Sequence, residues 1–240
     1  MRDLPPPLPP AERTVGQFVG ETIRAYGDNF WRALPLGIPI AIADQFSAHH
    51  HQVPQILVFL AVGPLIVLAY VRACSIVLRV EPTVLSFLVA GLIYLPFPAL
   101  RAVVVLPGIA WFAFIGLAVP AALVEKKGFR DSLVRGRQLG TADYVHALGS
   151  LAILVLVVGL GDTALTAALH TQGDSSQRVA LFVSDFVLTP LLYLGGALLY
   201  VDQAARVGSR RQDRRRRRDA HFHPPVDAQP AGRADDQVEP

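Results

Sequence analysis

The sequence predicts an all-α membrane protein with six transmembrane helices, an N-terminal amphipathic helix and a cytoplasmic interfacial helix. Hydrophobic residues make up 52% of the 240 residues and charged residues only 17%, whereas a soluble domain carries about 25% charge. The stretch 102–124 contains no charged side chain. Because about 20 mostly apolar residues suffice to cross a bilayer as a helix, this stretch alone indicates a membrane span.

Three regions of different composition follow one another along the chain. Residues 1–12 are rich in proline, which favours extended polyproline II, and we expect a disordered leader there. Residues 13–205 carry nearly all of the apolar stretches and form the predicted six-helix membrane domain. Residues 206–240 are first basic and then polar, with few apolar side chains, so we expect a disordered tail.

An amphipathic helix is predicted to begin after Thr14, because Thr14 and Gln17 have the spacing of a capping box. One face carries mainly apolar residues, and the opposite face is polar. The apolar face holds Val15, Phe18, Val19, Thr22, Ile23 and Tyr26, and the polar face holds Gln17, Glu21, Arg24 and Asp28. This helix is too polar to span the membrane, but its pattern suits the headgroup layer.

Six apolar stretches are long enough to be considered as spans. They cover residues 30–46, 54–71, 83–100, 102–124, 144–161 and 179–201. Several contain proline, which membrane helices tolerate because neighbouring groups can satisfy the freed carbonyls. The first and third stretches could instead be re-entrant segments.

The basic residues predict the orientation of these spans. With the N-terminus inside, only Arg101 and Arg178 of the 22 lysines and arginines lie outside, as the positive-inside rule requires. Arginine outnumbers lysine twenty to two, which indicates a GC-rich bacterial genome. We therefore expect a multi-pass protein of the bacterial cell (inner) membrane with both termini in the cytoplasm.

Asp185 is predicted to lie inside the sixth span, about 9 Å below the outer surface at about 1.5 Å per residue. A carboxylate at that depth needs a partner or access to water. Arg101 lies near the same surface, so one hypothesis is an intramembrane pair of Arg101 and Asp185. The alternative is that Asp185 reaches the surface without a partner.

The run of arginines in the tail is expected to contact anionic lipids at the cytoplasmic face, since each such charge contributes about 1 kcal/mol near the surface. The run comprises Arg214, Arg215, Arg216, Arg217 and Arg218. Binding to nucleic acid is the alternative, but no folded nucleic-acid module accompanies the run, so we expect no nucleic-acid partner.

A Gly-x-Gly-Asp string ends at Asp162 and resembles the motif that carries one aspartate of the intramembrane aspartyl proteases. That chemistry needs two carboxylates that share a proton, and Asp185 is the candidate for the second. The Tyr-Asp partner motif of that family is absent from the preceding span. The alternative interpretation is a helix end, with Gly161 closing the span and Asp162 facing water.

The most distinctive stretch is 118–140, where a span passes Pro120, reaches Glu125 at the inner face, turns at Gly128 and enters an amphipathic basic helix. Within that helix, Asp131 and Arg135 have the spacing of a surface ion pair. We expect Glu125, Gly128 and Arg135 to have structural or interfacial roles. The stretch resembles the membrane domain fused to some bacterial glycerophosphodiester phosphodiesterases, which also occurs in stand-alone relatives of unknown function.

The same resemblance extends over residues 13–205, through the Tyr-x-x-Asn-Phe run from Tyr26 to Phe30 and the inner link RVEPTV at 79–84. It implies a similar helical membrane domain. The segment from Asp131 to Arg135 matches the family pattern only approximately. A catalytic barrel of about 250 residues does not fit into 206–240, so the hydrolase activity is not expected here.

These observations favour a non-catalytic membrane module that binds lipid or a protein partner in the envelope. We expect no catalytic residue, cofactor or metal site, because no phosphate loop, serine elbow or zinc-helix motif is present. The first alternative is a transporter or permease subunit. The second is an intramembrane aspartyl protease using Asp162.

Overall fold

The computed structural model describes residues 9–47, 52–103, 105–169 and 174–222, with the backbone alone at 101–103, 105, 169, 174–175 and 215–222. Within these ranges every regular element is a helix. The elements in chain order are η1 (Pro10–Glu12), α1 (Val15–Asp28), α2 (Phe30–Ala33), η2 (Leu34–Gly37), α3 (Ile38–Ser47), α4 (Gln52–Leu78), α5 (Val84–Tyr94), α6 (Phe97–Val103), α7 (Val105–Ile115), α8 (Ala118–Glu125), α9 (Phe129–Ala142), α10 (Tyr144–Leu169) and α11 (Asp174–Phe222).

Four helices of the described chain are long and apolar enough to cross a membrane. They cover Gln52–Leu78, Leu106–Glu125, Tyr144–Ala168 and Ser176–Arg214. A shorter apolar helix covers Val84–Leu100. The predicted all-α class is confirmed, and the four helices are what a multi-pass membrane protein requires.

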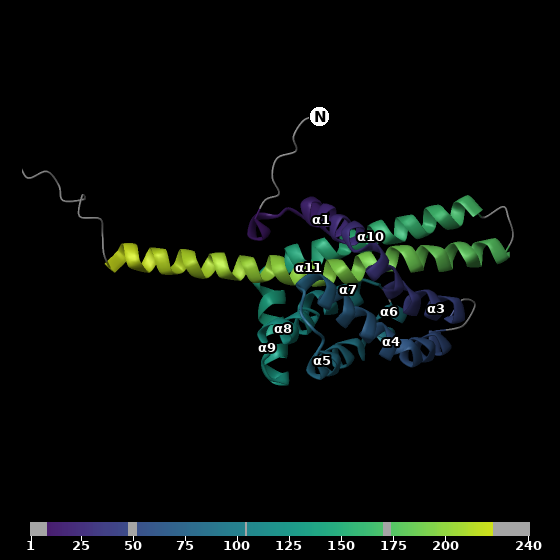
Figure 1. Ribbon diagram of the computed structural model, residues 1–240, viewed down its shortest axis with the longest axis horizontal. Helices are drawn as coiled ribbons and strands as arrows, with labels where there is room; N and C mark the ends of the chain where they lie inside the picture. The colour runs from purple at the N-terminus through teal and green to yellow at the C-terminus, as the bar shows by residue number, and fades with distance from the viewer. Residues whose placement is uncertain (1–8, 48–51, 104, 170–173, 223–240) are drawn as a thin grey trace, which may run out of the picture.

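Helix α11 forms the long axis of the molecule, and α10 lies beside it in the opposite direction (Figure 1). We call the end at which α3 leads into α4 and α10 leads into α11 the hairpin end. The opposite end of the helical body carries α9, which lies steeply across the direction of α11, and we call it the α9 end (Figure 1). These two ends are the natural candidates for the two membrane faces.

The N-terminal segment runs along α11 for most of the length of the body. Arg13 contacts Asp202, the Tyr26 hydroxyl donates a hydrogen bond to the Val187 carbonyl, and Gln45 donates one to the Arg178 carbonyl. From Asp202 to Arg178 is about 36 Å of helix at about 1.5 Å per residue. The predicted capping box of Thr14 and Gln17 is confirmed, but the helix that it begins does not lie alone at a surface.

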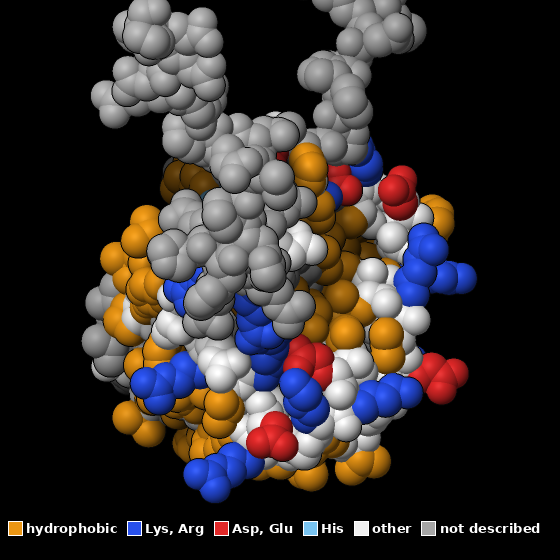
Figure 2. Space-filling view, turned by 90° about the vertical axis from the view of Figure 1, so that its left-hand side faces the viewer, with side chains coloured by type: hydrophobic (Ala, Val, Ile, Leu, Met, Phe, Trp, Pro, Cys, Tyr) orange, Lys and Arg blue, Asp and Glu red, His pale blue; other side chains and the backbone are white. Residues whose placement is uncertain are grey.

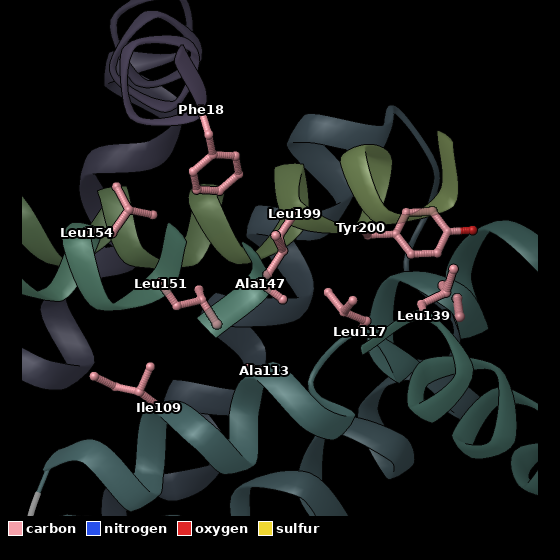
Figure 3. Packing of buried hydrophobic residues seen from close by; sticks show 11 residues of the cluster. Phe18, Ile109, Ala113, Leu117, Leu139, Ala147, Leu151, Leu154, Leu199 and Tyr200 are labelled. Carbon is pink, nitrogen blue, oxygen red and sulfur yellow. The ribbon is translucent and has the colours of Figure 1, made fainter. Parts of the chain in front are cut away.

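Helix α1 instead seats its apolar face on α10 and α11. Phe18, Thr22 and Tyr26 are buried, whereas Ile23, which was predicted to share that face, is 51% exposed. Figure 3 shows Phe18 pointing from α1 toward Leu154 of α10 and Leu199 of α11, and all three are at most 1% exposed. One buried residue per turn of α1 is enough to fill the groove between α10 and α11. The apolar face predicted from the sequence was wider than this, which is why Ile23 stays exposed.

Three of the predicted spans are divided into shorter helices. Residues 30–47 form α2, η2 and α3, with Pro35 in the 3-10 turn, and the third stretch stops at Tyr94 and restarts at Phe97 after a turn at Pro96. Proline lacks a backbone N–H and its ring clashes with the preceding turn, which explains both breaks. The fourth stretch is likewise divided at Gly116 into α7 and α8.

Helix α11 has 49 residues and continues to Phe222, although disorder was predicted from residue 206. Between Gly208 and His223 the sequence contains neither glycine nor proline, and arginine, glutamine and alanine favour helix. Residues 1–8 of the leader predicted at 1–12 and the polar part of the tail from 223 lie outside the described residues, whereas Pro10–Glu12 form the 3-10 helix η1.

Candidate functional site

The α8–α9 junction places Glu125 and Arg135 face to face. Glu125 ends α8, Lys126 adopts the left-handed conformation with a φ of 48°, and Gly128 caps α9 at a φ of −60°. The chain turns in this segment as predicted, but the left-handed residue is Lys126 and not Gly128. This reversal brings Arg135 Nε to 2.6 Å from Glu125 Oε1, while Lys127 Nζ lies 2.6 Å from the other oxygen.

Arg135 thus pairs with Glu125 across the junction, whereas its sequence spacing had suggested Asp131. The side chains of Glu125 and Arg135 are only 16% and 18% exposed, while that of Lys127 is 52% exposed. Charge-assisted hydrogen bonds gain strength where water is partly excluded. The Glu125–Arg135 contact therefore fixes the angle at which α9 leaves α8.

Replacing Glu125 with glutamine is expected to lower the free energy of unfolding by about 1.5 kcal/mol, because two hydrogen bonds to a charged acceptor lose their charge. Thermal unfolding of the detergent-solubilised protein measures the change. Asp131→Asn is the matched control, since Asp131 is exposed on the same helix. Equal losses in the two variants would show that the junction does not depend on this pair.

Two glycines seat α9 against α7 and α8. A Cβ at Gly136 would lie 2.4 Å from the backbone nitrogen of Ala118, and one at Gly140 would lie 2.4 Å from the carbonyl oxygen of Phe114. Real Cβ atoms essentially never approach other atoms so closely. Beside them, the Arg137 guanidinium lies 5.6 Å from the centre of the Phe114 ring, which is within the range of a cation–π contact. These close contacts therefore hold α9 against α7 and α8.

A cavity of about 580 Å³ lies between the helices in the half of the body near the hairpin end. Such a volume is typical of sites for small organic ligands. Its polar lining comes mainly from helix segments near the hairpin end, and includes Asp44, Ser47, Gln55, Asp162 and Asp185. The rest of the lining is largely aliphatic and aromatic, with Ile109, Val119, Leu151, Val155 and Leu192 among its members.

Aromatic side chains close the deep end of this cavity. Tyr70 lies edge-on to Phe112 with ring centres 5.2 Å apart, and 6.3 Å from the ring centre of Tyr193. The Tyr70 hydroxyl donates to the Gly116 carbonyl at 3.3 Å. Beyond these rings, toward the α9 end, Leu117 and Leu199 are fully buried. The cavity therefore has a polar end and an apolar, closed end.

Asp162 and Asp185 come from neighbouring helices and line the same cavity. Helix α10 continues for another two turns past Asp162, so Gly161 does not close the span. The Asp162 carboxylate accepts a hydrogen bond from the Ser184 hydroxyl. Within the described residues no hydrogen bond joins the two carboxylates, and a shared proton is what an aspartyl protease dyad needs.

Asp185 is 5% exposed. Its proposed partner Arg101 lies in α6, but the side chain of Arg101 is outside the described part of the chain. The Arg101–Asp185 pair therefore stays a prediction.

A second polar cluster, which the sequence did not indicate, lies at the α9 end. Arg13 Nη1 contacts the fully buried carboxylate of Asp202 at 3.0 Å, and Arg206 Nη1 contacts Asp143 at 3.0 Å. Arg206 also donates to the Arg13 carbonyl at 2.7 Å and lies 3.1 Å from His146 Nε2. We call these five residues the clasp, because they join the N-terminal segment, the α9–α10 junction and α11.

The only sequence signal for the clasp was the spacing of Asp202 and Arg206, four residues apart on one helix face. Their partners lie 189 and 63 residues away in sequence. No pattern within one helix can reveal such contacts, and Arg206 had been assigned to the tail.

Lysine and arginine side chains surround α11 where it leaves the body at the α9 end (Figure 2). Exposed basic residues there include Arg79, Lys126, Arg130, Arg137 and Arg210. Arg214 is exposed and lies about 18 Å along α11 beyond Asp202. The side chains of the remaining predicted lipid-facing residues, Arg215, Arg216, Arg217 and Arg218, lie outside the described part.

Among the described residues no group of three histidine, cysteine, aspartate or glutamate side chains is arranged to hold a metal ion. Comparison of the chain with protein-family models, with curated proteins and with solved structures finds no match. Any functional assignment therefore rests on the geometry of the α8–α9 junction, the cavity and the clasp.

Proposed function

We propose that this chain is a non-catalytic, six-pass module of the bacterial cell membrane that binds a lipid-like ligand in the cavity near the hairpin end. The observation that carries this proposal is the cavity itself, with about 580 Å³ between helices and polar groups gathered toward one end. A lipid has the same division into a polar and an apolar part.

Six passes are supported by the four long helices together with two broken crossings. The N-terminal segment lies against α11 from Asp202 to Arg178, which are near opposite ends of the helical body. Helices α5 and α6 together form the other broken crossing, and they pack against α4. Broken helices are stable at membrane depth where protein surrounds them.

The hairpin end is assigned to the outside and the α9 end to the cytoplasm. The gathering of basic side chains at the α9 end supports this orientation, because positively charged residues are enriched on the cytoplasmic side. In that orientation α9 lies in the inner headgroup layer, where Lys126, Arg130 and Arg137 can contact anionic lipids.

Purification of the full-length protein in native nanodiscs, followed by mass spectrometry, tests the binding function. We expect about one molecule of a specific lipid-like compound per chain, enriched over an unrelated membrane protein of similar size from the same membranes. Recovery of bulk lipid alone, in the proportions of the control, would contradict the proposal.

Transport is the second candidate. Asp162 and Asp185 line the cavity from two of the long apolar helices, and intramembrane carboxylates are typical of transport pathways. The closed aromatic end then has to open toward the α9 end during a cycle. Flux of a substrate through proteoliposomes, lost in Asp185→Asn, is the result that distinguishes transport from binding alone.

A further inference from the structure

We infer that the cavity takes an amphiphile with a single hydrocarbon chain, whose head lies among Asp44, Asp162 and Asp185 and whose chain ends at the rings of Tyr70 and Phe112. This inference rests on the proposed function and narrows the class of its ligand. It follows from the size of the cavity, from its polar lining and from its apolar end.

The dimensions of the cavity match one chain. Its lining on α11 extends from Leu181 to Tyr193, which is about 18 Å at about 1.5 Å per residue. A volume of about 580 Å³ lies in the range of sites that bury one small organic ligand. One long chain with a small head is of that size, whereas the two chains of a membrane phospholipid exceed it.

The polar lining favours a head that donates hydrogen bonds. Asp44, Asp162 and Asp185 contribute carboxylates from three different helices. Each carboxylate has two oxygens that can accept hydrogen bonds, so this end of the cavity is rich in acceptor atoms. A hydroxyl or amine head satisfies such acceptors, while a carboxylate or phosphate head brings further acceptors to the same place.

The remaining lining offers a hydrocarbon chain few polar groups. Trp111 Nε1 donates to the Ile93 carbonyl at 2.9 Å, the Tyr94 hydroxyl to the Phe59 carbonyl at 2.8 Å, and the Tyr70 hydroxyl to the Gly116 carbonyl. Because these donors are already engaged with backbone, the surface they leave facing the cavity is that of their rings. A saturated or isoprenoid chain packs against such rings without leaving a polar group unsatisfied.

Photo-crosslinking in nanodiscs of the full-length protein tests the inference. One probe is an alcohol with a chain of about 16 carbons, chosen to fill the cavity, and with a diazirine at the chain end. The comparison probe is a two-chain phospholipid with the same diazirine at the same depth. At equal mole fraction in the membrane, the alcohol is expected to label peptides containing Tyr70 and Phe112 about tenfold more strongly, which corresponds to about 1.4 kcal/mol.

Two substitutions on α11 locate the labelling. Thr189 lines the cavity and is 4% exposed, whereas Val183 is 44% exposed and does not line it. Thr189→Phe is expected to reduce labelling of the Tyr70 and Phe112 peptides about tenfold, since overpacking a filled site is unfavourable. Val183→Phe adds bulk to the same helix and is expected to leave labelling unchanged. The comparison of probes on the unaltered protein holds even where Thr189→Phe does not fold.

The outcomes separate this inference from the proposed function. Equal labelling of the Tyr70 and Phe112 peptides by both probes would overturn the single-chain assignment while leaving a lipid-binding cavity. Labelling confined to exposed apolar residues such as Leu156 and Leu160 of α10 would overturn the binding function itself. A fatty-acid probe that labels as strongly as the alcohol and the corresponding amine would overturn the assignment of the head.

Discussion

Gly136→Ala is expected to destabilise the protein by about 3 kcal/mol, at the upper end of what overpacking costs. The new Cβ would lie 2.4 Å from the backbone nitrogen of Ala118 and 2.5 Å from its Cα and Cβ. Backbone atoms cannot rotate aside as a flexible side chain can, so α9 has to move away from α8. Denaturation in mixed micelles, followed by helicity, measures the loss. Gly140→Ala meets the carbonyls of Ala113 and Phe114 and should behave in the same way.

Gly149→Ala provides the matched control, because a Cβ at Gly149 has no neighbour within 4 Å. In the interior of a helix, alanine is favoured over glycine by about 1 kcal/mol, so this variant is expected to be neutral or slightly more stable. A loss of stability in Gly136→Ala without a loss in Gly149→Ala isolates the effect of close packing, because the chemical change is the same in both variants. A loss at Gly149 as large as that at Gly136 would show that the packing of α9 is not the cause.

Asp202→Asn is expected to cost about 3 kcal/mol of stability, because it leaves the largely buried Arg13 without its carboxylate. The Asp202 side chain is fully buried and that of Arg13 is only 13% exposed. Once the carboxylate charge is lost, water has too little access to solvate the Arg13 guanidinium in its place. Arg13→Gln leaves Asp202 buried without its cation and should be comparably harmful. Chemical unfolding of the two single variants and the double variant gives the coupling between them.

Glu21→Gln is the control for the clasp. Glu21 pairs with Arg24 on the exposed face of α1 at 3.4 Å, and the Arg24 side chain is 61% exposed. Such a pair contributes about 0.5 kcal/mol or less. If Asp202→Asn had an effect no larger than Glu21→Gln, the clasp would be dispensable for joining the N-terminal segment to α11.

Local features of the chain could be predicted from the sequence. The capping box at Thr14 depends on residues three positions apart, and the buried face of α1 depends on helical periodicity, so both are visible in a short window. The uncharged stretch 102–124 indicated a span for the same reason, since length and composition decide it. The break at Gly116 within that stretch could not be predicted, because glycine in a membrane helix often has no such effect.

The sites depend on angles and on distant contacts, and here the sequence was less informative. Glu125 and Arg135 were both predicted to be structural or interfacial residues, but only the left-handed turn at Lys126 makes them partners. Asp162 and Asp185 were considered together only as a possible protease pair. That they line one cavity with Asp44 follows from the packing of α3, α10 and α11, which no periodicity reveals.

The contact between the beginning and the end of the chain has a consequence for biosynthesis. Residues 13–47 pack on α11 between Asp202 and Arg178, and α11 leaves the ribosome after the other described helices. Contacts so distant in sequence form late, since the intervening chain has to be ordered first. The N-terminal segment is therefore synthesised before its final neighbour and lacks that neighbour until α11 has been made. Truncation that removes Asp202 or Arg206 would leave residues 13–47 without these contacts in the final product. Such an incompletely packed form is suited to recognition by membrane quality control.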